Sequence, residues 1–112
     1  MNLQEKHQNH IFTYTVELDP PKSSSAKKTL EEAGLLKGYI DAINIADCPM
    51  ANLRMSPIAL SCLIQSQKNI ETIFHLTCRD RNSIGLQAEL LGAAALGVRN
   101  ILTLTGDQPS RG

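Results

Sequence analysis

The alternation of strand and helix is clearest between residues 70 and 104, which read IETIFHLTCRDRNSIGLQAELLGAAALGVRNILTL. Residues 70–77 are rich in β-branched and aromatic side chains and predict a strand. A polar loop then leads into a predicted helix over residues 84–96, which ends at a glycine. Residues 98–104 predict a second strand. A strand, a helical crossover and another strand make a unit in which the two strands run parallel.

The same rhythm extends toward the N-terminus. Strands are expected over residues 11–16 and 39–46, where β-branched residues are again frequent. Helices are expected over residues 26–36 and from Ser56 to about Gln67. Residues 1–9 are polar and are expected to form a flexible lead-in to the domain, which then spans residues 10–112. The complete order is β-α-β-α-β-α-β.

Local signals add detail to these predicted elements. One serine among residues 23–25 is expected to cap the helix that follows, and Ser56, which precedes a proline, is expected to cap the next. Residues 79–81 are expected to form a salt-bridged loop exposed to solvent. The predicted buried stripe of the last helix recurs at spacings of four and three and consists of Ile84, Ala88, Leu91 and Ala95.

Each predicted strand ends at a polar or reactive group, namely Glu17, Asp47, His75 or Asp107. In a parallel sheet these ends share one edge, where α/β folds bind ligands. A complete eight-stranded barrel needs about 250 residues, whereas this chain has 112. An open four-stranded sheet would leave parallel edges exposed. We therefore interpret the α/β chain as the first half of a (β/α)8 TIM barrel, truncated after its fourth strand.

Composition excludes several classes of function. Apolar residues make up 42% of the chain, which is typical of a globular protein. The formal net charge is zero, so no net positive charge attracts the chain to nucleic acid or to an anionic membrane. Apolar runs fall short of the roughly 20 residues that span a bilayer, and the N-terminus does not resemble a signal peptide. The 3 cysteines form no Cys-x-x-Cys pair. These features predict a cytoplasmic protein without a structural metal site.

From about Thr13 onward the sequence resembles the N-terminal half of the methylenetetrahydrofolate reductase family. Four segments carry the resemblance, and they are Val16-Glu17-Leu18-Asp19-Pro20-Pro21-Lys22, Ile43-Asn44-Ile45-Ala46-Asp47, His75-Leu76-Thr77-Cys78-Arg79-Asp80-Arg81-Asn82 and Leu104-Thr105-Gly106-Asp107. The last two of these segments are the most specific.

The resemblance implies an oxidoreductase with FAD at the carboxyl ends of its barrel strands. It implies reduction of 5,10-methylenetetrahydrofolate to 5-methyltetrahydrofolate, with a reduced nicotinamide or a partner protein as electron donor, in one-carbon metabolism and methionine biosynthesis. Glu17 matches the glutamate that acts as general acid, and Asp107 matches an aspartate beside flavin and pterin that stabilises a developing cation. Burial or a neighbouring negative charge would help Glu17 hold its proton. The second carboxylate of Asp19 could supply that charge.

The resemblance also implies a set of flavin contacts. His75, Thr105, Gly106 and Asp107 match residues that contact FAD, and Ala46 stands where some relatives have a threonine, so a contact there would come from its backbone. The later strands of the family carry most of the nicotinamide and folate site. We therefore expect the 112-residue piece to be inactive by itself.

Two other functions stay open at this point. The chain could be a catalytically inactive half-barrel that serves as an assembly or binding module, pairing with itself as a homo-oligomer or with another chain. It could instead be a metal-dependent aldolase or hydrolase with Asp47, His75 and Asp107 as ligands. No His-x-His pattern or carboxylate pair favours this last hypothesis.

Overall fold

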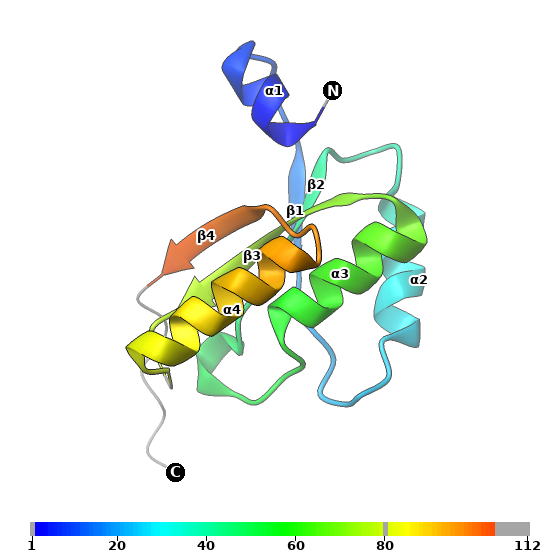
Figure 1. The fold of residues 1–112 in the computed structure, drawn as a ribbon. Coiled ribbons are helices and arrows are strands. Elements are labelled where there is room, and N and C mark those ends of the chain that lie inside the picture. The colour runs from blue at the N-terminus through cyan, green and yellow to red at the C-terminus, as the bar shows by residue number, and fades with distance from the viewer. Residues whose placement is uncertain (1, 80, 105–112) are drawn as a thin grey trace.

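A computed structural model describes residues 2–79 and 81–104 of the chain (Figure 1). Helices and strands alternate along it as predicted. The elements are α1 (Leu3–Gln8), β1 (Thr15–Leu18), α2 (Lys27–Leu36), β2 (Ala42–Ile45), the 3-10 turn η1 (Pro49–Ala51), α3 (Pro57–Lys68), β3 (Glu71–Thr77), α4 (Ser83–Ala95) and β4 (Asn100–Leu104). The strands are shorter than their predicted counterparts, chiefly at their N-terminal ends.

The four strands form one sheet in the order β1-β2-β3-β4, and every neighbouring pair is parallel. This confirms the predicted parallel arrangement. Ile45 of β2 and Phe74 of β3 are register partners and therefore point to the same side, where both are buried beneath the helices. Sequential strands with their helices on one face are consistent with part of a TIM barrel, whereas doubly wound sheets carry helices on both faces.

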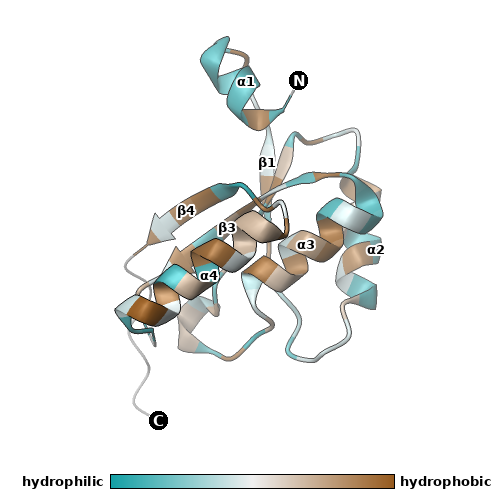
Figure 2. Ribbon diagram, viewed as in Figure 1, coloured by the Kyte–Doolittle hydropathy of each residue, from teal (hydrophilic) through white to brown (hydrophobic). Residues whose placement is uncertain are grey.

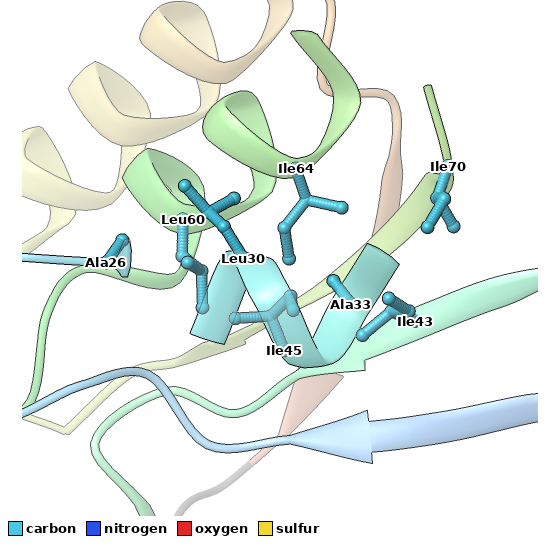
Figure 3. Close-up of a cluster of buried hydrophobic side chains, with 8 residues drawn as sticks. All are labelled: Ala26, Leu30, Ala33, Ile43, Ile45, Leu60, Ile64 and Ile70. Carbon is cyan, nitrogen blue, oxygen red and sulfur yellow. The ribbon is translucent and has the colours of Figure 1, made fainter. Parts of the chain in front are cut away.

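The main core fills the space between the sheet and helices α2 and α3 (Figure 3). Ile43 and Ile45 project from β2 toward Leu60 and Ile64 of α3, and Ala33 of α2 completes the contact without any exposed surface. The alternation of β2 explains this packing, because residues two apart in a strand share a face. Asn44, which lies between Ile43 and Ile45 in the strand, therefore points to the opposite face of the sheet.

A second core cluster lies beneath α4 and contains Phe74, Leu76 and Ala93. Its packing shows that the predicted stripe of α4 was wrong. Ile84 is 79% exposed and Leu91 is 74% exposed, whereas Leu86 packs against the cluster. Figure 2 shows hydrophobic residues along much of α4, so hydropathy alone does not distinguish its inner face.

Residues 3–8, for which no helix or strand was predicted, form helix α1. Asn2 and Glu5 form a capping box at the start of α1. Leu3 is buried, and its backbone N–H donates to both carboxylate oxygens of Glu71 at 2.9 and 3.0 Å. The Lys6 ammonium donates to Asp41 at 2.6 Å. These contacts attach α1 to the start of the sheet.

The predicted serine cap of α2 was wrong, whereas the N-cap of α3 was correctly located. Ala26 occupies the N-cap of α2, and the hydroxyl of Ser23 bonds locally to the backbone of Ser25 instead. Ser56 is the N-cap of α3, ahead of a proline in the first turn, but its side chain makes no capping hydrogen bond. Proline, with φ fixed near the helical value, accounts for the helix start there.

Candidate active site

Three polar side chains meet on the face of the sheet opposite the helices. Glu17 of β1 is the register partner of Asn44 of β2. Asn44 in turn pairs with Ile73 of β3, and His75 lies two residues further along the same strand. Because register partners and residues two apart share a face, Glu17, Asn44 and His75 project together. They come from three different strands near the carboxyl edge of the sheet.

His75 lies between the other two side chains. Its Nε2 atom is 3.2 Å from Oδ1 of Asn44, within hydrogen-bond distance. Its Nδ1 atom is 3.9 Å from Oε1 of Glu17. The His75 side chain is only 9% exposed, whereas the Glu17 side chain is 59% exposed. A buried imidazole thus connects an internal amide to a carboxylate that solvent or a ligand can reach.

This arrangement is suited to moving a proton. The carbonyl oxygen of Asn44 only accepts, so in this hydrogen bond Nε2 of His75 carries the hydrogen. In the neutral ring, Nδ1 then presents a lone pair toward Glu17. A carboxyl group can give a proton to this lone pair, and the carboxylate can take one back from the imidazolium that forms, after a small approach of the two side chains.

A second polar cluster, centred on Asp47, ties the loops at the same edge together. The buried carboxylate of Asp47 accepts hydrogen bonds from the backbone N–H of Thr77 at 2.9 Å and from its hydroxyl at 3.1 Å. Arg81 donates to both oxygens of the same carboxylate, at 2.6 and 3.1 Å. The loop after β2 is thereby joined to the loop between β3 and α4. The expected salt bridge of the 79–81 loop exists, but its partner is Asp47.

The ion pair governs the ionisation of both groups. Burial by itself opposes the charged form of Asp47, but the hydrogen bonds from Arg81 and Thr77 and the charge of Arg81 outweigh it and lower the pKa of Asp47. The hydrogen bond to Asp47 likewise raises the pKa of Arg81. Asp47 is therefore a bound, ionised structural carboxylate. Its engaged oxygens argue against its proposed role as a metal ligand.

The segment that follows Asp47 has an unusual backbone. Cys48, Met50 and Ala51 all have left-handed φ values, of 41°, 57° and 58°. Such conformations are costly for residues other than glycine and persist only where neighbouring contacts impose them. Arg79 supplies one such contact, since its guanidinium donates to the carbonyl of Cys48 at 2.9 Å. The η1 turn is thus held beside the carboxyl edge of the sheet.

The structure brings together some of the predicted site residues. Glu17 and His75 lie near one another, as the shared strand edge suggested. Ala46 is buried just beyond β2, and its backbone N–H donates to the carbonyl of Leu18 at 3.4 Å. Thr105, Gly106 and Asp107 lie outside the described residues.

Sequence reasoning did not single out Asn44 or the partner of Arg81. Asn44 is a polar residue within a strand whose other members are Ala42, Ile43 and Ile45, and that contrast was a visible signal. Its contact with His75, however, depends on the register between β2 and β3. The pairing of Arg81 with Asp47 bridges 34 residues and carries no local sequence signal.

The other end of the sheet contains a cavity of about 810 Å³ between α1 and the strand starts. Leu3, Ile70, Glu71 and Asn100 are among its lining residues. It therefore lies at the edge opposite Glu17 and His75, away from the polar side chains that suit chemistry. Across residues 2–79 and 81–104, no three metal-binding side chains cluster. No helix in the described part is long and apolar enough to cross a membrane.

Comparison with known proteins identifies the family. The family model described as methylenetetrahydrofolate reductase matches residues 2–112. The search of curated proteins found no match. The family match extends over every residue after Met1 and includes all four motifs found in the sequence. The chain therefore belongs to the methylenetetrahydrofolate reductase family, a family of oxidoreductases whose name specifies a folate substrate.

Proposed function

We propose that this member of the methylenetetrahydrofolate reductase family forms part of a flavin-dependent site that reduces 5,10-methylenetetrahydrofolate to 5-methyltetrahydrofolate. The observation that carries the proposal is the contact of Glu17 with His75 on the face opposite the helices. Glu17 is the exposed member of the pair, so a bound substrate can reach its carboxyl group. The family match supplies the folate as the substrate class.

Glu17 acts as the general acid in this proposal. Opening the five-membered ring of the methylene folate requires a proton on its N10 atom, and the carboxyl group of Glu17 donates it. Glu17 is left as a carboxylate beside the imidazole of His75, 3.9 Å away. Asp107 is proposed to stabilise the cation that develops on the folate when the ring opens.

Two residues at this edge support the proposed flavin site. Ala46, buried at the end of β2, has no bulk beyond Cβ to obstruct a planar ring, and His75 offers an imidazole edge on the same face. Thr105, Gly106 and Asp107 are proposed to complete the contacts. When bound, FAD supplies the hydride that reduces the folate. A reduced nicotinamide is the proposed electron donor.

The cellular setting follows from the same proposal. A methyl folate product belongs to one-carbon metabolism and methionine biosynthesis, for which we propose a cytoplasmic location. We also propose that residues 1–112 alone do not turn over the folate. In the described sheet, the face that carries Glu17 and His75 is opposite the helices, and a site of this kind needs walls that exclude water.

A chimeric enzyme tests the proposed function directly. Residues 2–112 replace the corresponding segment of an active family member, and two half-reactions are measured separately: bleaching of the flavin by nicotinamide, and its reoxidation by methylenetetrahydrofolate. We expect Glu17→Gln to slow the folate half-reaction by about 100-fold or more, the usual range for a lost general acid. Flavin bleaching should persist.

The matched control is Glu32→Gln, which makes the same substitution at an exposed position on α2. It should leave both half-reactions unchanged. Rapid folate reduction by the Glu17→Gln chimera would overturn the role of Glu17. A folded chimera without flavin would overturn the proposed function.

A second candidate function is an assembly module without catalysis. The exposure of Ile84 and Leu91 on α4 favours it, because this apolar surface suits contact with another protein surface. Sedimentation of the purified chain tests this candidate. A discrete dimer without flavin affinity would favour assembly, and a monomer that binds FAD would favour the enzyme.

A further inference from the structure

The Glu17, Asn44 and His75 cluster contains one residue that the proposed function leaves unexplained. Asn44 is a half-buried amide in a strand whose neighbouring residues, Ile43 and Ile45, are completely buried in the core. A polar group removed from water costs free energy unless it is hydrogen-bonded. The partner that the structure provides for its Oδ1 atom is Nε2 of His75, at 3.2 Å.

We propose that Asn44 is a positioning residue that fixes the tautomer of His75 and thereby makes His75 the proton partner of Glu17. This inference rests on the proposed function for the role of Glu17, although the tautomer itself does not. The carbonyl of Asn44 holds the hydrogen on Nε2, so that Nδ1 of the neutral ring faces Glu17 with a lone pair.

The proton balance of this pair is simple. When Glu17 gives its proton to the folate nitrogen, it becomes a carboxylate. The Nδ1–H bond of the His75 imidazolium breaks, the proton moves to Glu17, and the ring returns to its neutral Nε2–H form. A hydronium ion or buffer acid in the solvent then returns a proton to Nδ1 and restores the imidazolium, so that the net change is one proton moved from the solvent to the folate nitrogen. No electron transfer or further reactant is involved, and Asn44 keeps its hydrogen bond throughout.

The surroundings of His75 support a pairwise exchange. Among the described residues, the titratable group in contact with the imidazole ring is Glu17 on β1. The neighbour on β2 is the neutral Asn44, and the register partner on β4 is Leu102. The helices pack on the other face of β3, against Phe74 and Leu76. The His75 side chain is 9% exposed, which limits competition from bulk water.

Nitrogen NMR of the purified chain measures the tautomer without flavin or folate. The chain has 3 histidines. His7→Gln and His10→Gln variants assign the two exposed rings, so that the His75 signals can be identified. In long-range proton–nitrogen spectra of the neutral ring, we expect the Nε2–H form of His75 to predominate.

Substitutions at position 44 separate this role from a structural one. Asn44→Leu removes the acceptor and should lower the ratio of Nε2–H to Nδ1–H by about fivefold, the effect of one net hydrogen bond. Asn44→Asp keeps an acceptor oxygen and should retain the Nε2–H form. Glu17→Gln should also retain it. An unchanged ratio in a folded Asn44→Leu chain, or a predominant Nδ1–H form in the unsubstituted chain, would overturn the proposal.

Carbon NMR tests the proton exchange with Glu17. The Nδ1 atom of His75 is 3.9 Å from Oε1 of Glu17, so the side-chain carboxyl signal of Glu17 should show a step when the imidazole of His75 gains or loses its proton. His75→Gln should abolish that step, and the carboxyl signal of Glu32 should never show it. Absence of the step overturns the pairing. A chimera in which Glu17→Gln has no effect overturns the role of Glu17 and leaves the tautomer result standing.

Discussion

Arg81 donates hydrogen bonds from both of its terminal nitrogens to the buried carboxylate of Asp47, at 2.6 and 3.1 Å. The Asp47 side chain is 1% exposed and that of Arg81 is 19% exposed. Two loops that are remote in sequence are thereby joined at the same edge of the sheet as Glu17. A buried carboxylate of this kind stays in place only while its charge is compensated.

Removing the guanidinium should therefore be strongly destabilising. We expect Arg81→Met to lower the free energy of unfolding by about 3 kcal/mol, because Asp47 is left buried and unpaired. Urea denaturation of the chain measures the change. The matched control is Arg99→Met at an exposed position, which should change it by less than about 0.5 kcal/mol. Equal effects of the two substitutions would contradict the assigned role of the ion pair.

The carboxylate of Asp47 should also make the free energy of unfolding depend on pH. The pKa of Asp47 is lowered in the folded state, since its hydrogen bonds with Arg81 and Thr77 outweigh the effect of burial. The unfolded chain then binds a proton more readily, so the contribution of Asp47 is complete above its unfolded pKa of about 3.9 and is lost as the pH falls through the lower folded value.

Urea midpoints measured between pH 2.5 and pH 6 test this dependence. Asp47→Asn should be less stable than the unsubstituted chain near pH 6, and the two curves should converge as the pH falls below about 4. Asp41, whose pKa is lowered by hydrogen bonds from Lys6 and the Tyr14 backbone, should contribute in the same direction in both proteins. A constant difference across the whole range would contradict the prediction.

Gly92 and Gly97 both have room for a Cβ atom but differ in backbone conformation. A Cβ atom added at Gly92 or at Gly97 would meet no heavy atom within 4 Å. Gly92 lies within α4, whereas Gly97 has a φ of +77°. We expect Gly92→Ala to raise the free energy of unfolding by about 0.5–1 kcal/mol, because alanine favours a helix.

Gly97→Ala should have the opposite effect. An L side chain in the left-handed region costs about 1–2 kcal/mol. Thermal and urea unfolding of the two single variants measure the difference in sign. If both substitutions stabilised the chain, the turn after α4 would not have the conformation described for Gly97.

The sequence carried enough information to predict the order of elements and the parallel sheet. Alternation of strand and helix is a local property that propensity and periodicity record directly. The capping box of Asn2 and Glu5 was also a readable signal for α1. Prediction failed where the answer depended on contacts between remote segments. The bond between Asn44 and His75 is set by strand register, which neither strand specifies alone.

The inner face of α4 illustrates the same limit. Ile84 and Leu91 are seven residues apart, and so are Leu86 and Ala93. Both pairs form apolar rows at helical spacing, and periodicity cannot choose between them. The sheet makes the choice, because Phe74 and Leu76 pack against Leu86 and Ala93.

A matched pair of substitutions on α4 tests that choice. Leu86→Lys places a charge against the cluster of Phe74 and Leu76, and we expect it to lower the free energy of unfolding by about 2 kcal/mol or more. Leu91 is 74% exposed, so Leu91→Lys should change stability by less than about 0.5 kcal/mol. Urea denaturation measures both.

A larger loss for Leu91→Lys would instead assign the inner face to Ile84 and Leu91. Sedimentation at several concentrations separates that result from self-association, since loss of a dimer would make the effect of Leu91→Lys depend on protein concentration.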